Sequence, residues 1–257
     1  MIRECTTHKE IYYELAADLK KVELRMEQLY PKAIKEFKKE KKFPAWRWYE
    51  YNIPSSGNEY IIFFYAESRF RIETPTQDYF GIDYDGHKRL IIKGYTDIYQ
   101  RDFESKPYAI RAIDAFTNHF LERYKERCLK NENLSTNDIA CIFFSRNRGE
   151  RTSIEITKEI NRRIEKYGPH AQIGFKITDG FCFAQSAVVG EIDESGDHSK
   201  DKAEARISIF TTFMDTQSLA DTQINAINKG REDAWENMFE IFAKEAKNGI
   251  LSLKLDQ

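Results

Sequence analysis

The sequence predicts an α+β fold, in which one or two antiparallel sheets of about six to seven strands pack against several helices. Three patterns carry this prediction. Apolar residues recur every three or four positions in residues 8–42, they alternate with a period of two between residues 59 and 100, and this alternation returns after residue 171. Because no long linker separates these stretches, we expect a single domain over residues 1–257.

The first predicted element is a long N-terminal helix over residues 8–42. Thr7 is a suitable N-cap, with Glu10 three residues later as its capping-box partner. Pro31 should kink or divide the helix, since proline removes a backbone donor. Four lysines in residues 38–42 suit the C-terminal end of a helix, and the alternative interpretation is a basic handle for nucleic acid.

An aromatic cluster follows in residues 43–51, with Trp46, Trp48, Tyr49 and Tyr51. Such clusters commonly anchor a helix onto a sheet, and we predict that role here. The alternative is a platform on which nucleic-acid bases stack.

An antiparallel meander is expected next, with strands over residues 60–66, 69–73, 79–84 and 88–99. Thr74-Pro75 and Asp85-Gly86 provide turns between them. In the last of these strands the odd-numbered residues share one face, and that face is polar.

The second half of the chain mixes helices with another strand group. We predict a helix over about residues 136–144, capped by Ser135 or Thr136, and another over about residues 153–166. A hairpin is expected from residues 172–178 and 181–189, which flank Asp179-Gly180, and a further strand over residues 206–213. A long C-terminal helix should cover residues 216–247, weakened at Gly230.

The predicted helix around residues 116–127 carries more chemistry than packing requires. Laid out at about 100° per residue, its apolar side chains form one face that runs from Ile110 to Cys128. His119 lies outside this face, Arg123 lies at its border, and Arg127 lies within it. Since successive members are four residues apart, the three side chains should form one ridge.

A histidine beside two arginines is a candidate catalytic or anion-binding site. The arginines would stabilise a phosphate, and the imidazole would move a proton. The ridge could be completed by cationic and hydroxyl groups from a basic loop and from strands, namely Arg146, Arg148, Lys93, Tyr95, Thr211 and Thr212. The alternative is an amphipathic helix whose charges form ordinary surface pairs.

Other common chemistries find no support in the sequence. It has no HExxH, GxSxG, GxGxxG or P-loop pattern, and its four cysteines have no CxxC spacing, so we predict no metal and no cofactor. Residues 193–204 match the oxygen spacing of a calcium loop, but His198 occupies the position that requires glycine. A solvated hairpin loop is the preferred interpretation.

Composition limits the partners. The formal net charge is −2 and the pI is about 6.3, so bulk electrostatics do not favour non-specific nucleic-acid binding, although a local basic site is compatible with them. The N-terminal residues lack a hydrophobic signal core, and no apolar run is long enough to span a bilayer. We therefore expect a cytoplasmic protein without a membrane partner.

These observations predict a non-catalytic binding or assembly protein, because no complete catalytic set is visible. Its terminal helices would provide the surface for a homodimer or another partner. The alternative is a metal-independent phosphodiesterase, ribonuclease-like, or an anion-binding protein that holds RNA or phosphate on His119, Arg123 and Arg127.

Overall fold

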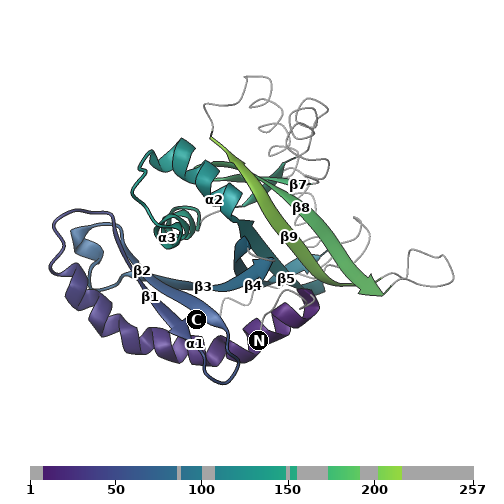
Figure 1. The fold of residues 1–257 in the computed structure, drawn as a ribbon, viewed down its shortest axis with the longest axis horizontal. Helices are drawn as coiled ribbons and strands as arrows, with labels where there is room; N and C mark the ends of the chain where they lie inside the picture. The colour runs from purple at the N-terminus through teal and green to yellow at the C-terminus, as the bar shows by residue number, and fades with distance from the viewer. Residues whose placement is uncertain are drawn as a thin grey trace, which may run out of the picture.

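The nine described strands of the chain form one sheet (Figure 1). The computed structural model describes residues 8–85, 88–99, 108–148, 151–154, 173–191 and 202–215. The strand order is β1-β2-β3-β4-β5-β9-β8-β7-β6, and neighbours are antiparallel except for the parallel pair β5 and β9. The predicted class, a largely antiparallel sheet with helices, is thus confirmed, and the two strand groups of the sequence join in one sheet.

The first strand group comprises β1 (Ala45–Asn52), β2 (Glu59–Ala66), β3 (Thr76–Asp85), β4 (Lys88–Tyr99) and β5 (Tyr108–Thr117). The second comprises β6 (Thr152–Ile154), β7 (Ile173–Ile177), β8 (Gly180–Glu191) and β9 (Lys202–Met214). The predicted hairpin around Asp179-Gly180 and the predicted strand 206–213 are confirmed. The expected number of six to seven strands is wrong, because β1, β5 and β6 were not recognised as strands.

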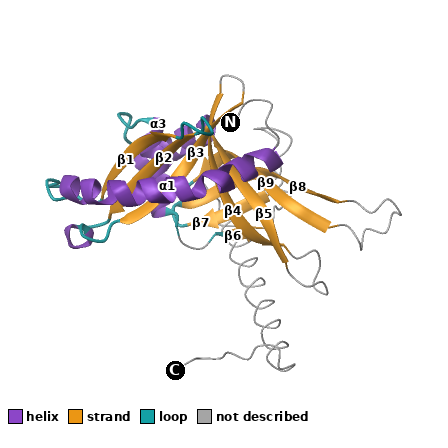
Figure 2. Ribbon diagram, turned by 90° about the horizontal axis from the view of Figure 1, so that it is seen from below, coloured by secondary structure: helices purple, strands orange, loops and turns teal. Residues whose placement is uncertain are grey.

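Helix α1 (His8–Phe37) runs along the outer face of the curved sheet (Figures 1 and 2). Its buried side chains include Leu15, Val22 and Phe37, which belong to the same core cluster as Ile62 and Phe64 of β2. The long N-terminal helix is therefore confirmed, although it ends at residue 37. It continues through Pro31 without a break, so the predicted division is wrong. Pro31 lies on the exposed side, where water can satisfy the carbonyl that loses its partner.

The opposite, concave face encloses α2 (Asn118–Tyr124), the π-helical turn η2 (Lys125–Leu129) and α3 (Thr136–Arg146) (Figure 1). Phe120 and Tyr124 of α2 contact Phe143 of α3 edge to face, with ring centroids 5.2 and 5.1 Å apart. Ser135, one of the two predicted caps, is the N-cap of α3 and forms a capping box with Asp138. These helices fill the space that the bend of the sheet leaves.

The helix predicted around residues 116–127 begins at Asn118, and the extension of its apolar face back to Ile110 is wrong, because residues 108–117 form β5. Strand β5 is buried on both faces, with Phe116 packed towards α2 and Ile113 packed towards α1. A strand between two layers does not alternate between apolar and polar residues, so its period is obscured. Thr117 ends the strand: its hydroxyl donates to the carbonyl of Phe210 on β9 (3.0 Å) and accepts from the amide of Phe120 (3.1 Å), which caps α2.

Two further predicted segments differ from the structure. The aromatic cluster of residues 43–51 lies largely in β1, where the indoles of Trp46 and Trp48 donate to Asp138 of α3 (3.1 and 2.8 Å). Its role in docking a helix is confirmed. Residues 69–73 do not form a strand. They contain a 3-10 turn, η1 (Arg69–Arg71). Of the two apolar residues in this segment, Ile72 is buried and Phe70 is exposed.

Some predictions fall on residues outside the described ranges. They include most of the helix expected over residues 153–166, the C-terminal helix over 216–247, the glycine of the Asp85-Gly86 turn and the acidic loop 193–204. Across the described helices, none is both long and apolar enough to cross a membrane.

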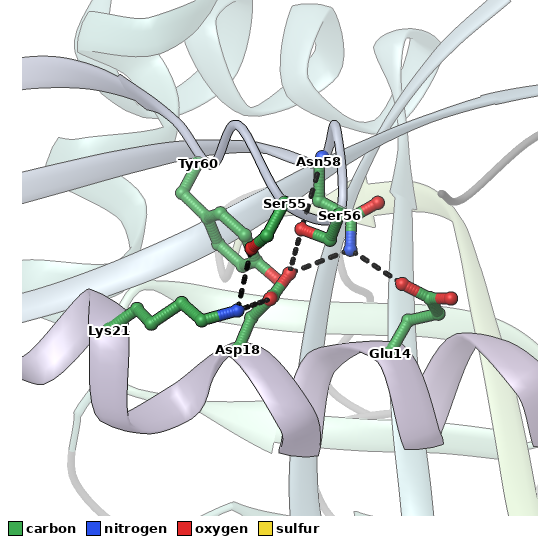
Figure 3. A network of polar contacts seen from close by, with 7 residues as sticks. All are labelled: Glu14, Asp18, Lys21, Ser55, Ser56, Asn58 and Tyr60. Carbon is green, nitrogen blue, oxygen red and sulfur yellow. Dashed lines mark hydrogen bonds and ion pairs between the residues drawn. The ribbon is translucent and has the colours of Figure 1, made fainter.

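A buried carboxylate joins α1 to the loop between β1 and β2 (Figure 3). Asp18, with a side chain 1% exposed, accepts hydrogen bonds from Ser56 (2.7 Å), the Asn58 amide (2.7 Å) and the Tyr60 hydroxyl (3.1 Å), and pairs with Lys21 (3.4 Å). Burial by itself would raise the pKa of Asp18, but these donors outweigh it and hold the pKa below the ordinary value. The ionised form therefore stabilises the position of α1 on the sheet.

We expect Asp18→Ala to lower the free energy of unfolding by about 3 kcal/mol, because Ser56 and the buried Tyr60 hydroxyl lose their acceptor, and the Asn58 amide keeps its bond to Glu14 but loses the one to Asp18. Asp18→Asn should cost less at neutral pH. Because the folded pKa is lowered, the charge contributes fully above the ordinary value of 3.8 and loses its contribution as pH falls through the folded value.

Urea unfolding of the wild type and Asp18→Asn between neutral and acidic pH measures this difference. The gap between the two proteins should narrow on acidification. The exposed Glu27→Gln is the matched control on the same helix. A gap that widens on acidification, or one no larger than that of the control, contradicts the account.

Candidate functional site

The predicted ridge of His119, Arg123 and Arg127 is not assembled by contacts among the described residues. His119 is exposed in the first turn of α2, and Arg123 pairs with Glu126 at 2.9 Å. Arg127 lies in the π-helical turn and donates to the carbonyl of Phe213 on β9. The wider π turn changes the side-chain angles on which the four-residue spacing depends. An anion site on these residues stays a prediction, and these contacts lend it no geometric support.

Arg146 lies near the C-terminal end of α2, and Asp179 joins the two by accepting hydrogen bonds from both Arg146 and Tyr124. Asp179, in the turn between β7 and β8, accepts from Arg146 (2.6 Å), the Tyr124 hydroxyl (2.5 Å) and the Asn147 amide (3.0 Å). Its own backbone amide donates to Asn147 (3.0 Å). Asp179 therefore occupies the position beside Arg146 that an external anion would need. This cluster clamps α2, α3 and the β7–β8 hairpin together.

The electrostatics of the clamp favour a structural role. Burial and the hydrogen bond to Asp179 raise the pKa of Tyr124 well above its ordinary value, so the phenol stays protonated and donates. Burial likewise raises the pKa of the neighbouring Cys128 thiol to about 11. A thiol with a raised pKa is a poor nucleophile at neutral pH.

Lys93 and Tyr95 lie where the sequence places them, on the polar face of β4, which belongs to the concave side of the sheet. Lys93 pairs with Asp78 (2.5 Å), and the Tyr95 hydroxyl donates to Asp114 of β5 (3.1 Å). Arg151 also pairs with Asp114, and its guanidinium carbon lies 3.7 Å from the centre of the Phe175 ring. Arg206 pairs with Asp97 in the same region. Each of Lys93, Arg151 and Arg206 is thus matched by an acid of the protein.

Asp114 is the acid in this row that sequence reasoning missed. Its signal is a single carboxylate inside the otherwise apolar end of β5. Burial raises the pKa of Asp114, although the charge and hydrogen bond of Arg151 oppose the shift. Burial beside Asp114 also raises the pKa of Tyr95 to about 12. Within the part of the chain that is described, this row contains no unpaired carboxylate that could act as a general base.

An unbalanced group of charges is present at one end of the sheet, where the loop after α1 meets the loop after β2. The pairing of Ala45 with Ala66 places the two loops side by side. They are joined by an ion pair from Lys38 to Glu73 (2.7 Å) and by a hydrogen bond from the Tyr30 hydroxyl to the Glu73 carbonyl (3.0 Å).

We call the exposed cations of these two loops the basic end: Lys39, Lys41, Lys42, Arg69 and Arg71. None of these side chains has an ion-pair or hydrogen-bond partner among the described residues. The nearby acids Glu36 and Glu40 both pair with Arg47, and Glu36 also pairs with Lys32. Glu67 is exposed and has no ion pair in the described ranges, so it cancels part of the local charge.

Arg148, predicted for anion binding, lies at the same end of the sheet. It is exposed and donates to the carbonyl of Gln77 (2.9 Å), near the start of β3. A neutral acceptor leaves its charge uncompensated. In the second of the two loops, Phe70 is 97% exposed between Arg69 and Arg71. Sequence reasoning placed Phe70 in a strand and therefore missed its exposure.

Metal ligation finds no assembled set in the described ranges, since no three His, Cys, Asp or Glu side chains lie together there. No known protein family, curated protein or solved structure matches the chain. The candidate site therefore depends on the geometry of this chain alone.

We expect Asp179→Ala to lower the free energy of unfolding by about 3 kcal/mol, because Arg146, Tyr124 and Asn147 lose a shared acceptor that is 7% exposed. Tyr124→Phe should cost about 1 kcal/mol and should be non-additive with Asp179→Ala. Thermal and urea unfolding of both variants and of their double mutant measure this coupling.

The control is His119→Ala, which should change stability by less than about 0.5 kcal/mol because His119 is exposed. Additive effects of Tyr124→Phe and Asp179→Ala would show that Asp179 does not act as a clamp.

Proposed function

We propose that this chain is a non-catalytic binding protein and that the basic end is its binding surface for an anionic macromolecule. The observation that carries the proposal is the contrast between the two charged regions. On the concave face Lys93, Arg151 and Arg206 each pair with an acid, whereas the cations of the basic end have no acid partner in the described chain.

The cations of the basic end are arranged for long-range attraction of an anionic chain and not for catalysis. Exposed lysines and arginines without partners retain their full charge and attract an anionic chain, and they do so less as salt screens them. Arg148 extends this charge around the sheet end. The overall charge of −2 gives no support to non-specific attraction of an anionic chain by the rest of the surface.

The competing hypothesis of a metal-independent phosphodiesterase receives less support. It needs His119 beside Arg123 and Arg127, and no contact in the described residues joins them. Dimerisation through the terminal helices stays a prediction. The outer side of α1 is largely polar, with Tyr13 and Leu24 as its exposed large apolar residues.

We expect the protein to bind inorganic polyphosphate, with an affinity that falls as salt rises. The triple variant Lys39→Glu, Lys41→Glu, Lys42→Glu should lose at least about tenfold in affinity at low salt, since each phosphate contact contributes to the electrostatic term. Titration calorimetry at two salt concentrations measures this loss.

The matched control is Lys20→Glu, Lys88→Glu, Lys130→Glu, which makes the same change in net charge at exposed lysines elsewhere. Equal loss in both triple variants would assign the effect to overall charge. That result, or no binding by the wild type, overturns the proposal.

A further inference from the structure

Phe70 is held in solvent by a loop whose backbone is fixed. Ile72, two residues later, is buried in the core cluster below α1. The amide of Arg71 donates to the carbonyl of Ser68 (3.0 Å), and the amide of Thr74 donates to the carbonyl of Arg71 (3.2 Å). Together with the bonds from Tyr30 and Lys38 to Glu73, these contacts fix both ends of the turn. The ring therefore stands in water at a defined place.

Because the ring of Phe70 is exposed, the protein lacks the free energy that burial of this side chain would contribute. Burying a phenylalanine side chain is worth about 1.5–3 kcal/mol. In η1 no residue is buried, and Phe70 is 97% exposed. A partner that covers the ring would recover this free energy, so the exposure points to a contact made on binding.

The chemistry around the ring selects the partner. Arg69 and Arg71 flank Phe70, and lysines 39, 41 and 42 lie on the neighbouring loop. An aromatic ring beside unpaired cations is the combination that binds single-stranded nucleic acid, because a base stacks on the ring while cations neutralise the phosphates. Arginine adds planar, bidentate pairing with phosphate.

A lipid surface fits the same residues less well. Interfacial binding scales with the apolar area that enters the bilayer. Phe70 is the one large apolar side chain exposed in these two loops, and the other exposed large apolar residues of the described chain lie elsewhere: Tyr13 and Leu24 on α1, Tyr84 on β3 and Val188 on β8. Base stacking requires only one ring for each base.

We infer that Phe70 is a stacking platform for an unpaired base of single-stranded RNA or DNA, whose adjacent phosphates are bound by Arg69, Arg71 and the lysines of the basic end. This inference rests on the proposed function, since it names the macromolecule that the basic end would bind. It adds a requirement for a base, which polyphosphate does not have.

The test uses the full chain and three fluorescein-labelled oligonucleotides of about twelve nucleotides: oligo(U), oligo(dT) and an abasic strand of equal length. Fluorescence anisotropy compares the wild type with Phe70→Ala and Phe70→Trp. Leu24→Ala, which truncates another exposed apolar residue, is the matched control. Phe70 is exposed, so its replacement should leave the fold intact, and a thermal melt of each variant checks this.

We expect Phe70→Ala to bind the base-containing strands at least about fivefold more weakly, with Phe70→Trp and Leu24→Ala close to the wild type. The wild type should bind the abasic strand as weakly as Phe70→Ala does. Binding of polyphosphate should not change in Phe70→Ala. Similar affinities for oligo(U) and oligo(dT) indicate a site open to either nucleic acid, and a preference for one of them identifies the natural source; both results support the inference.

Three outcomes overturn the inference, and they differ in what they say of the proposed function. Equal binding of base-containing and abasic strands, with intact polyphosphate binding, removes the stacking role and leaves the anionic surface. Failure to bind every strand and polyphosphate removes both proposals. Binding of vesicles that contain anionic lipid, lost in Phe70→Ala while strand binding persists, assigns the ring to a membrane surface.

Discussion

The parallel pairing of β5 with β9 is the constraint on which the rest of this structure depends. It joins two antiparallel strand groups, which are far apart in sequence, into one sheet. Thr117 reinforces the junction, because its hydroxyl binds the carbonyl of Phe210 on β9 and also caps α2. Phe116 stacks on Phe210 directly beside it, with ring centroids 4.5 Å apart. The same residues thus set the sheet order and the place where α2 begins.

The enclosed helices determine which charged side chains are paired within the protein. With α2 and α3 inside the bend, Asp179 meets Tyr124 and Arg146, and the concave face beyond them carries cations opposite acids. Buried charges require partners because their desolvation is costly. The cations of the basic end lie outside the bend, where water solvates them and no acid is needed. The bend of the sheet therefore separates charged side chains that are paired inside it from the unpaired cations of the basic end.

The elements with local signals could be predicted from the sequence. The period of α1, the N-cap at Ser135 and the Asp179-Gly180 hairpin each depend on residues close together in the chain. Strand β5 could not be assigned in this way, since burial between two layers hides its period. Residues 69–73 alternate between polar and apolar side chains, which predicts a strand that contains Phe70. In the structure they form a turn instead.

The candidate site was harder to predict than the fold because it depends on long-range contacts. The spacing of His119, Arg123 and Arg127 predicts a ridge, which stays a prediction. Arg127 lies in the π-helical turn and donates to the carbonyl of Phe213, whereas His119 and Arg123 lie in α2. The sequence predicts Arg148 as an anion-binding residue, and a nucleic-acid handle is only the alternative interpretation of the lysines in residues 38–42. Only the strand order shows that they share one end of the sheet, because β3 follows β2 and both flank the loop that carries Phe70.

Lysine acetylation, measured by mass spectrometry with and without a single-stranded oligonucleotide, tests the location of binding most directly. The account predicts slower acetylation of Lys39, Lys41 and Lys42 in the presence of the oligonucleotide, with the exposed Lys20, Lys88 and Lys130 unchanged. Unchanged rates at the basic end, together with protection at Lys125 beside the predicted ridge, would contradict it.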